Sequence, residues 1–186
     1  MHAVETNQKA AALRSPQPPH AEEPAQRAVV LCVDDEPSVL SALRRVLARD
    51  HHEVLIACGG AEALEILAER PVDLIISDMR MPHMSGAQLL SEAASRWPDT
   101  VRLLLTGYSD LESAVSAVNE GGIYRYLTKP WTDDNLKLTV REGIDKRRLK
   151  HERDRLLAIT REQNDELKYL NNEHENRVLK RTRGAR

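Results

Sequence analysis

Short aliphatic runs that alternate with amphipathic stretches are the feature of this sequence that most restricts its fold. Five runs rich in Val, Ile and Leu span Val29–Val33, Val54–Ala57, Val72–Ser77, Val101–Thr106 and Ile123–Thr128. Such runs are typical of strands that are buried on both faces of a parallel sheet. Between them, apolar residues recur at helical spacing in Ser38–Ala48, Ala61–Glu69, Gln88–Arg96 and Leu111–Asn119.

This alternation predicts an α/β fold with a doubly wound, five-stranded parallel sheet and helices on both of its faces. Pro37 suits the first turn of the first helix, where its missing N–H costs little. Asp110 is placed to cap the fourth helix. Because ligands bind at the carboxyl ends of the strands in such sheets, the polar residues that follow each strand are the candidate functional residues.

The flanking segments differ from this central domain, which we expect to span residues 28–145. Residues 1–27 are rich in proline and have no apolar periodicity, so we predict a disordered leader. From Thr132 a helical pattern runs without proline to about Lys180. We expect residues 146–186 to form a helical coiled-coil extension of the domain.

The extension has a heptad seam interrupted by polar residues. Its members follow one another at spacings of seven, four and three: Leu149, Leu156, Gln163, Leu167, Leu170 and His174. The pattern predicts a weak parallel homodimer through this helix. The alternative is a solvated helix that packs against its own domain.

Composition restricts the possible setting of the protein. The formal net charge of −2 gives no general attraction to nucleic acid or anionic membranes. No apolar run approaches the length that spans a bilayer, and the N-terminus lacks the apolar stretch of an export signal. We therefore expect a cytoplasmic protein without a membrane partner. No DNA-binding helix-turn-helix pattern is visible.

Cys32 and Cys58 both lie in apolar runs and are predicted to be buried thiols.

Charged and hydroxyl residues follow four of the predicted strands. Asp34 and Asp35 follow the first strand, Asp78 the third, Thr106 ends the fourth, and Lys129 follows the fifth. Three carboxylates at one sheet edge repel one another unless a cation lies among them, and Mg²⁺ prefers such oxygen ligands. With a lysine and a hydroxyl beside them, these groups suit the stabilisation of a transferring phosphoryl group.

These motifs closely resemble the receiver domain of bacterial two-component response regulators. The resemblance covers about residues 28–145 and consists of four pieces in order: Asp34-Asp35, the run from Asp78 to Gly86 (Asp-Met-Arg-Met-Pro-His-Met-Ser-Gly), Thr106, and Lys129-Pro130. It implies a flavodoxin-like sheet with strand order 2-1-3-4-5. It also implies a sensor histidine kinase or phosphotransfer protein as the partner.

The resemblance assigns the acidic residues to phosphorylation and metal binding. Asp78 resembles the phosphoacceptor, the nucleophile that forms an acyl phosphate. Asp35 and Asp78 would bind Mg²⁺ directly, together with the backbone carbonyl of Arg80. Asp34 would act mainly through a metal-bound water.

The remaining residues are assigned to signalling. Lys129 would contact the phosphoryl group, and Thr106 would turn toward it. Tyr126 would then move inward and complete the switch. The family reports this change on the face formed by the fourth helix, the fifth strand and the last helix.

Other functions are consistent with parts of this pattern. The chain is predicted to be a regulator and not an enzyme, because dehalogenase-type phosphohydrolases need a second Asp where this sequence has Arg80. An alternative is a coiled-coil scaffold or adaptor with a regulatory receiver. A further alternative is a fragment of a larger regulator that lacks its output enzyme domain.

Overall fold

A computed structural model describes residues 27–107 and 122–183, and the side chains up to residue 174. Within these ranges, five parallel strands form one sheet with the order β2-β1-β3-β4-β5. This confirms the predicted fold class and strand order. The strands are β1 (Val29–Val33), β2 (Glu53–Ala57), β3 (Leu74–Asp78), β4 (Val101–Thr106) and β5 (Arg125–Thr128). The helices are α1 (Pro37–Ala48), α2 (Gly60–Glu69), α3 (Gly86–Arg96) and α5 (Asp133–Arg183).

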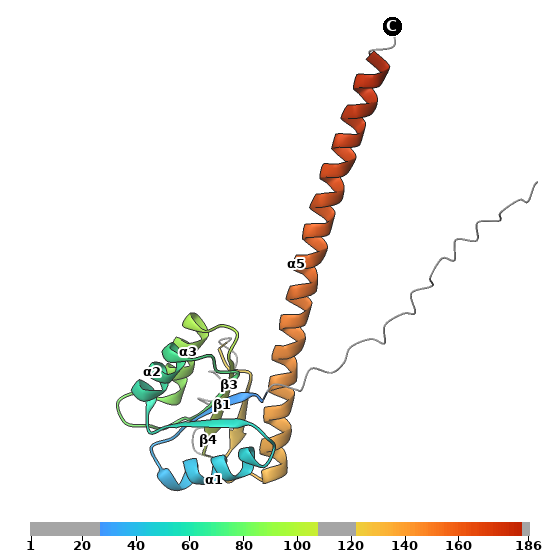
Figure 1. The fold of residues 1–186 in the computed structure, drawn as a ribbon. Helices are drawn as coiled ribbons and strands as arrows, with labels where there is room; N and C mark the ends of the chain where they lie inside the picture. The colour runs from blue at the N-terminus through green and yellow to red at the C-terminus, as the bar shows by residue number, and fades with distance from the viewer. Residues whose placement is uncertain (1–26, 108–121, 184–186) are drawn as a thin grey trace, which may run out of the picture.

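The two faces of the sheet are covered by different helices, and each carries its own hydrophobic core (Figure 1). On one face, α1 and the start of α5 pack against Val30, Leu74 and Leu103. On the other face, α2 and α3 pack against Leu31 and Ile75. Because side chains alternate along a strand, consecutive residues of these strands enter opposite cores. Burial on both faces explains the continuous apolar runs in the sequence.

The bounds of three strands differ from the predicted ranges. β2 begins at Glu53 and not at Val54, β3 spans Leu74–Asp78 and not Val72–Ser77, and β5 begins at Arg125 and not at Ile123. Val72 and Ile123 are nevertheless buried. The apolar pattern therefore reports burial, which extends beyond the hydrogen-bonded ladder. The predicted fourth helix, its cap and almost all of the predicted leader lie outside the described residues.

The cysteine prediction was correct for Cys32 and wrong for Cys58. Cys32 lies inside β1 and is buried, which raises the pKa of its thiol to about 12. Cys58 is exposed, since β2 ends at Ala57 and the chain turns there toward α2. The backbone N–H of Cys58 donates to Glu62 Oε2 at 2.7 Å. The apolar run thus continued one residue past the strand that buries it.

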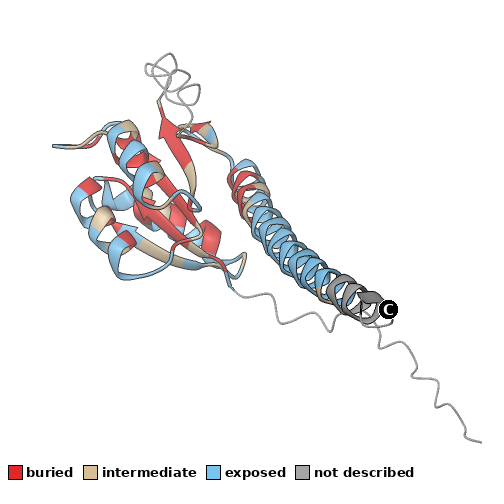
Figure 2. Cartoon of the chain, turned by 90° about the horizontal axis from the view of Figure 1, so that it is seen from above, coloured by how far each residue is buried: buried red, intermediate tan, exposed pale blue. Residues whose placement is uncertain are grey.

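Helix α5 begins in the domain and continues far beyond it (Figure 1). Thr132 Oγ1 accepts a hydrogen bond from Asn135 N at 3.3 Å and caps the helix. Leu136, Val140 and Ile144 are buried against the sheet, whereas the described side chains from residue 152 to 172 are exposed (Figure 2). Among the described residues, no helix combines the length and apolar character that crossing a membrane requires.

Candidate functional site

The carboxyl ends of four strands, β1, β3, β4 and β5, bring the predicted site residues to one edge of the sheet. Parallel pairing aligns the end of β3 with β4, and the end of β4 with β5. Past the strand ends, Lys129 N donates to the carbonyl oxygen of Thr106 at 2.8 Å, and Asp34 N donates to that of Ala57 at 3.2 Å. Backbone hydrogen bonds therefore hold these segments together independently of any contact between their side chains.

Lys129 bridges two carboxylates that come from distant parts of the sequence. Its Nζ lies 2.7 Å from Asp34 Oδ2 and 2.6 Å from Asp78 Oδ1. The side chains of Asp34 and Asp78 are only 1% and 10% exposed, and that of Lys129 is 23% exposed. Burial acts to lower the pKa of Lys129, but the hydrogen bonds and charges of the two carboxylates outweigh it, and the pKa is raised. The site thus contains a charged ammonium between two shielded acids.

The second oxygen of each carboxylate is held by the backbone. Asp34 Oδ1 accepts from Glu36 N at 2.9 Å, and Asp78 Oδ2 accepts from Arg80 N at 2.7 Å. Both carboxylates are therefore oriented at both of their oxygens. Such charge-assisted bonds fix the orientation of the two carboxylates.

The backbone around Asp78 is held by residues whose roles were missed at the sequence level. Ser77 Oγ donates to the Asp78 carbonyl oxygen at 3.0 Å. Gly86 lies so close that a Cβ there would be 1.9 Å from the same oxygen. Ser85 and Gln88 form a capping box that sets the start of α3 beside this carbonyl. The glycine eight residues after Asp78, inside the capping sequence Ser85–Gln88, was the available signal.

Asp35 and Arg80 are exposed, unlike Asp34 and Asp78. Within the described ranges, no group of three or more His, Cys, Asp or Glu side chains is arranged to hold a metal ion. The two carboxylates that are already gathered, Asp34 and Asp78, share Lys129 as their cation. The metal role of Asp35 and of the Arg80 carbonyl therefore stays a prediction.

Thr106 and Tyr126 lie on neighbouring strands at this edge. Thr106 is buried, and its Oγ1 donates to the carbonyl oxygen of Gly107 at 3.2 Å. Tyr126 pairs with Leu104 in the sheet, so alternation places Thr106 and Tyr126 on the same face. Tyr126 is partly buried against the α2–α3 core. The switch role of the two residues stays a prediction.

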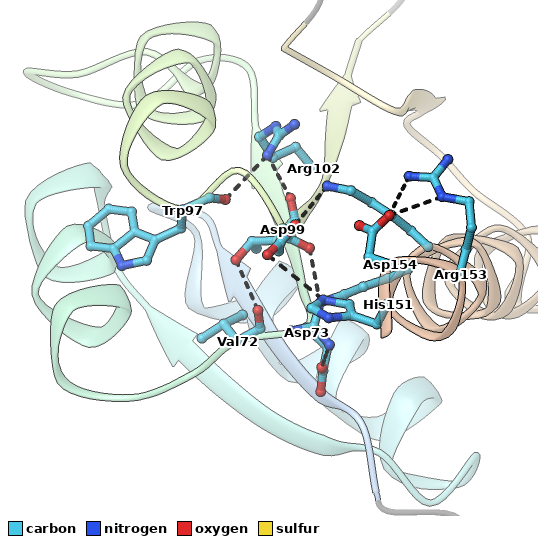
Figure 3. A network of polar contacts seen from close by, with 11 residues as sticks. Val72, Asp73, Trp97, Asp99, Arg102, His151, Arg153 and Asp154 are labelled. Atoms are coloured by element: carbon cyan, nitrogen blue, oxygen red, sulfur yellow. Dashed lines mark hydrogen bonds and ion pairs between the residues drawn. The ribbon is translucent and has the colours of Figure 1, made fainter. Parts of the chain in front are cut away.

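A second polar network, at the opposite edge of the sheet, was not predicted (Figure 3). It joins α5 to the loop before β4 and to Asp73, just before β3. Arg147 pairs with Asp73 and donates from Nε to the Asp99 carbonyl oxygen at 2.9 Å. Lys150 Nζ lies 2.7 Å from Asp99 Oδ1, and this hydrogen bond is the main cause that lowers the pKa of Asp99. The helix is therefore attached to the domain beyond residue 145, where the boundary was predicted.

Comparisons with known proteins agree on the type of domain. The response regulator receiver domain family matches residues 30–141. The hydrogenase transcriptional regulatory protein HoxA of Cupriavidus necator is 41% identical over 131 residues, which cover 70% of this chain and 27% of that protein. The DNA-binding transcriptional regulator NtrC of Escherichia coli is 39% identical over 119 residues, 64% of this chain and 25% of that protein. The chain thus spans about a quarter of the length of these curated relatives.

A solved structure gives the same result for the fold. The signal receiver domain of an HD domain-containing protein from Pseudomonas fluorescens is 39% identical with a TM-score of 0.65. The match covers 68% of this chain and 93% of that one.

Proposed function

The chain belongs to the response regulator receiver domain family, and from that premise we propose that Asp78 accepts a phosphoryl group from a sensor histidine kinase or a phosphotransfer protein. The observation that carries this proposal is the bridge from Lys129 Nζ to both Asp34 and Asp78. It brings a positive charge to the carboxylate that would receive a dianionic group. An ion pair on the exposed surface would not carry the same argument, because exposed ion pairs are weak.

The transfer proposed for Asp78 is an in-line displacement. One carboxylate oxygen attacks the phosphorus atom, and the bond between phosphorus and the donor's imidazole nitrogen breaks. The electron pair of that bond stays on the imidazole, and an acyl phosphate forms on Asp78. Lys129 would then pair with a phosphoryl oxygen, and the Arg80 N–H holds the carboxylate in position for the attack.

Mg²⁺ is the proposed cofactor, and the donor groups at this edge fit it. Asp34 and Asp78 supply hard carboxylate oxygens that already share a cation, and the exposed Asp35 lies next to Asp34 in the sequence. We propose Asp35, Asp78 and the Arg80 carbonyl as ligands, with Asp34 acting through a water. A bound Mg²⁺ neutralises charge on the transferring group.

The proposed route of the signal begins at Thr106. Its hydroxyl donates to the neighbouring Gly107 carbonyl, so rotation toward a phosphoryl oxygen exchanges one acceptor for a charged one. Tyr126, on the same face, would fill the vacated space. The surface of β5 and α5 would report the change, together with the predicted fourth helix, which lies outside the described residues.

The output of the signal is proposed from the relatives. HoxA and NtrC are named as transcriptional regulators, so we propose control of transcription by a cytoplasmic regulator. The receiver from the HD domain-containing protein favours a second candidate, control of an attached or associated HD domain. In both cases α5 would carry the signal as part of a homodimer, and the receiver itself would not be an enzyme.

Labelling with a small phosphodonor tests the phosphoacceptor. Incubation with acetyl phosphate and Mg²⁺ is expected to add one phosphoryl group, measured by intact mass, and hydroxylamine should remove it because it cleaves acyl phosphates. Asp78→Asn should abolish the label. Asp50→Asn is the matched control, since Asp50 also contacts cations, Lys137 and Arg141, but away from the site. Equal labelling of Asp78→Asn and wild type would contradict the proposal.

A phosphatase assay separates the regulator from the enzyme alternative. The regulator is expected to release no more than one equivalent of phosphate from small phosphate esters. Repeated turnover that requires Asp78 would favour a phosphohydrolase.

A further inference from the structure

Helix α5 presents a continuous seam to solvent once it leaves the domain. The seam consists of eight residues at alternating spacings of four and three: Leu149, Arg153, Leu156, Thr160, Gln163, Leu167, Leu170 and His174. Its leucines are 51–71% exposed. A helix whose other faces are this polar gains most of its stability by packing its apolar face against a partner. The seam extends over about 38 Å at the rise of an α-helix.

The charges beside the seam favour a second copy of this chain, in parallel, as the occupant. Each heptad contributes two residues to the seam, and the first of the two is Arg153, Thr160, Leu167 or His174. In a parallel pair, the residue that precedes this first seam residue lies beside the seam of the partner helix. Glu152 precedes Arg153, and three heptads later Glu173 precedes His174. Parallel, in-register pairing therefore sets an acid of one helix beside a basic seam residue of the other, twice along the helix.

The opposite orientation is less favourable. An antiparallel pair centred on Thr160 and Gln163 would set Arg153 against Leu170. Burying a guanidinium against a leucine without an acid partner is costly. Thr160 suits a seam in either orientation, because its hydroxyl already donates to the Leu156 carbonyl oxygen at 2.9 Å.

The seam begins where α5 is still attached to the receiver. Leu149 and Arg153 line an open cavity of about 580 Å³ between α5 and the segments around Asp99 and Tyr124. Lys150, between them in sequence, forms an ion pair with Asp99. The first two layers of a coiled coil would therefore lie against the receiver, and a shift in the loop before β4 would move them.

We propose that α5 pairs with α5 of a second copy as a parallel, in-register coiled coil, in which Arg153 exchanges its contact with Asp154 for Glu152 of the partner subunit. In the single chain, Arg153 donates to Asp154 Oδ1 from Nε at 3.0 Å and from Nη2 at 2.7 Å, and both side chains are more than half exposed (Figure 3). The exchange costs little because an exposed pair between adjacent residues is weak. This inference rests on the proposed signalling through α5.

Disulfide cross-linking tests the orientation and register. In full-length protein with Cys58→Ser, Leu156→Cys is expected to give a covalent dimer on oxidation, because identical seam residues face each other only in a parallel pair. Ala158→Cys, about 200° around the helix, is the control and should remain monomeric. Cys32 is buried and does not interfere. Both variants are oxidised with and without acetyl phosphate. The proposal is overturned if Leu156→Cys forms no dimer under either condition, or if the two variants cross-link equally.

Charge reversal tests the specific pair. Arg153→Glu and Glu152→Arg should each raise the dimer dissociation constant about tenfold in sedimentation, since each sets like charges together. The double variant should recover to within about threefold of wild type. Asp154→Ala should not weaken the dimer. Failure of the double variant to recover, or a weaker dimer for Asp154→Ala, would refute the exchange.

The two proposals fail separately. Labelling of Asp78 is measured on the same samples. Labelled protein without a Leu156→Cys dimer refutes the coiled coil alone. Cross-linked protein without label refutes the phosphoacceptor and leaves the pairing in place.

Discussion

Replacing Lys129 by methionine removes the cation that bridges Asp34 and Asp78. One oxygen of each carboxylate contacts Lys129 Nζ, at 2.7 Å for Asp34 and 2.6 Å for Asp78. The two oxygens are therefore at most about 5.3 Å apart, the sum of these distances. Two unit charges at this separation repel by about 3 kcal/mol at an effective dielectric constant of about 20. Because the site is partly open to water and salt, we expect about 1–2 kcal/mol of lost stability.

The measurement is urea unfolding in EDTA and in Mg²⁺. In EDTA, Lys129→Met should have a free energy of unfolding about 1–2 kcal/mol below wild type. Mg²⁺ should stabilise the variant more than wild type, since the metal ion restores the missing positive charge and no longer competes with the ammonium. The reasoning is refuted if the variant is as stable as wild type in EDTA, or if its gain from Mg²⁺ is no larger.

Lys137→Met is the matched control. Lys137 is 28% exposed, close to the 23% of Lys129, but it contacts a single carboxylate, that of Asp50, at 3.5 Å. Its loss should cost less than about 1 kcal/mol. It should also leave the response to Mg²⁺ unchanged.

The stability difference between wild type and Lys129→Met should also depend on pH in a defined direction. The pKa of Lys129 is raised above its ordinary 10.5 in the folded protein. Its contribution is therefore fully present below pH 10.5 and is lost as the pH rises through the folded pKa. The difference in unfolding free energy should be constant from pH 7 to about 10 and shrink above that range. A difference that grows with rising pH would contradict this assignment.

Two further predictions concern packing and burial. Gly86→Ala should cost about 1–3 kcal/mol and reduce labelling of Asp78, because the new Cβ would lie 1.9 Å from the Asp78 carbonyl oxygen. Gly59→Ala, where a Cβ meets nothing within 4 Å, is the control in the same urea and labelling assays, and equal effects of the two changes would refute the close approach. With a thiol reagent at pH 8, Cys58 should react at once and Cys32 only after unfolding. Rapid reaction of both thiols in native protein would show that Cys32 is accessible.

The sequence by itself was sufficient to predict the sheet and the approach of Asp34, Asp78 and Lys129 at its edge. Apolar runs that are buried on both faces require helices on both sides, and parallel strands all present their carboxyl ends at the same edge. Asp34, Asp78 and Lys129 directly follow or end their strands, so their approach follows from topology. The motif resemblance added the strand order, which hydrophobic periodicity does not contain.

Contacts between elements were decided only by the tertiary structure. No local periodicity in the sequence predicts three features of the structure. These are the bridging geometry of Lys129, the exposure of Asp35 and Cys58, and the ion pair between Arg147 and Asp73. The residues of the last pair are 74 positions apart. Such contacts depend on where each strand stops and how the side chains of separate elements pack. Hydrophobic patterns specify which face of an element is buried, but only packing in three dimensions specifies which charge lies opposite which.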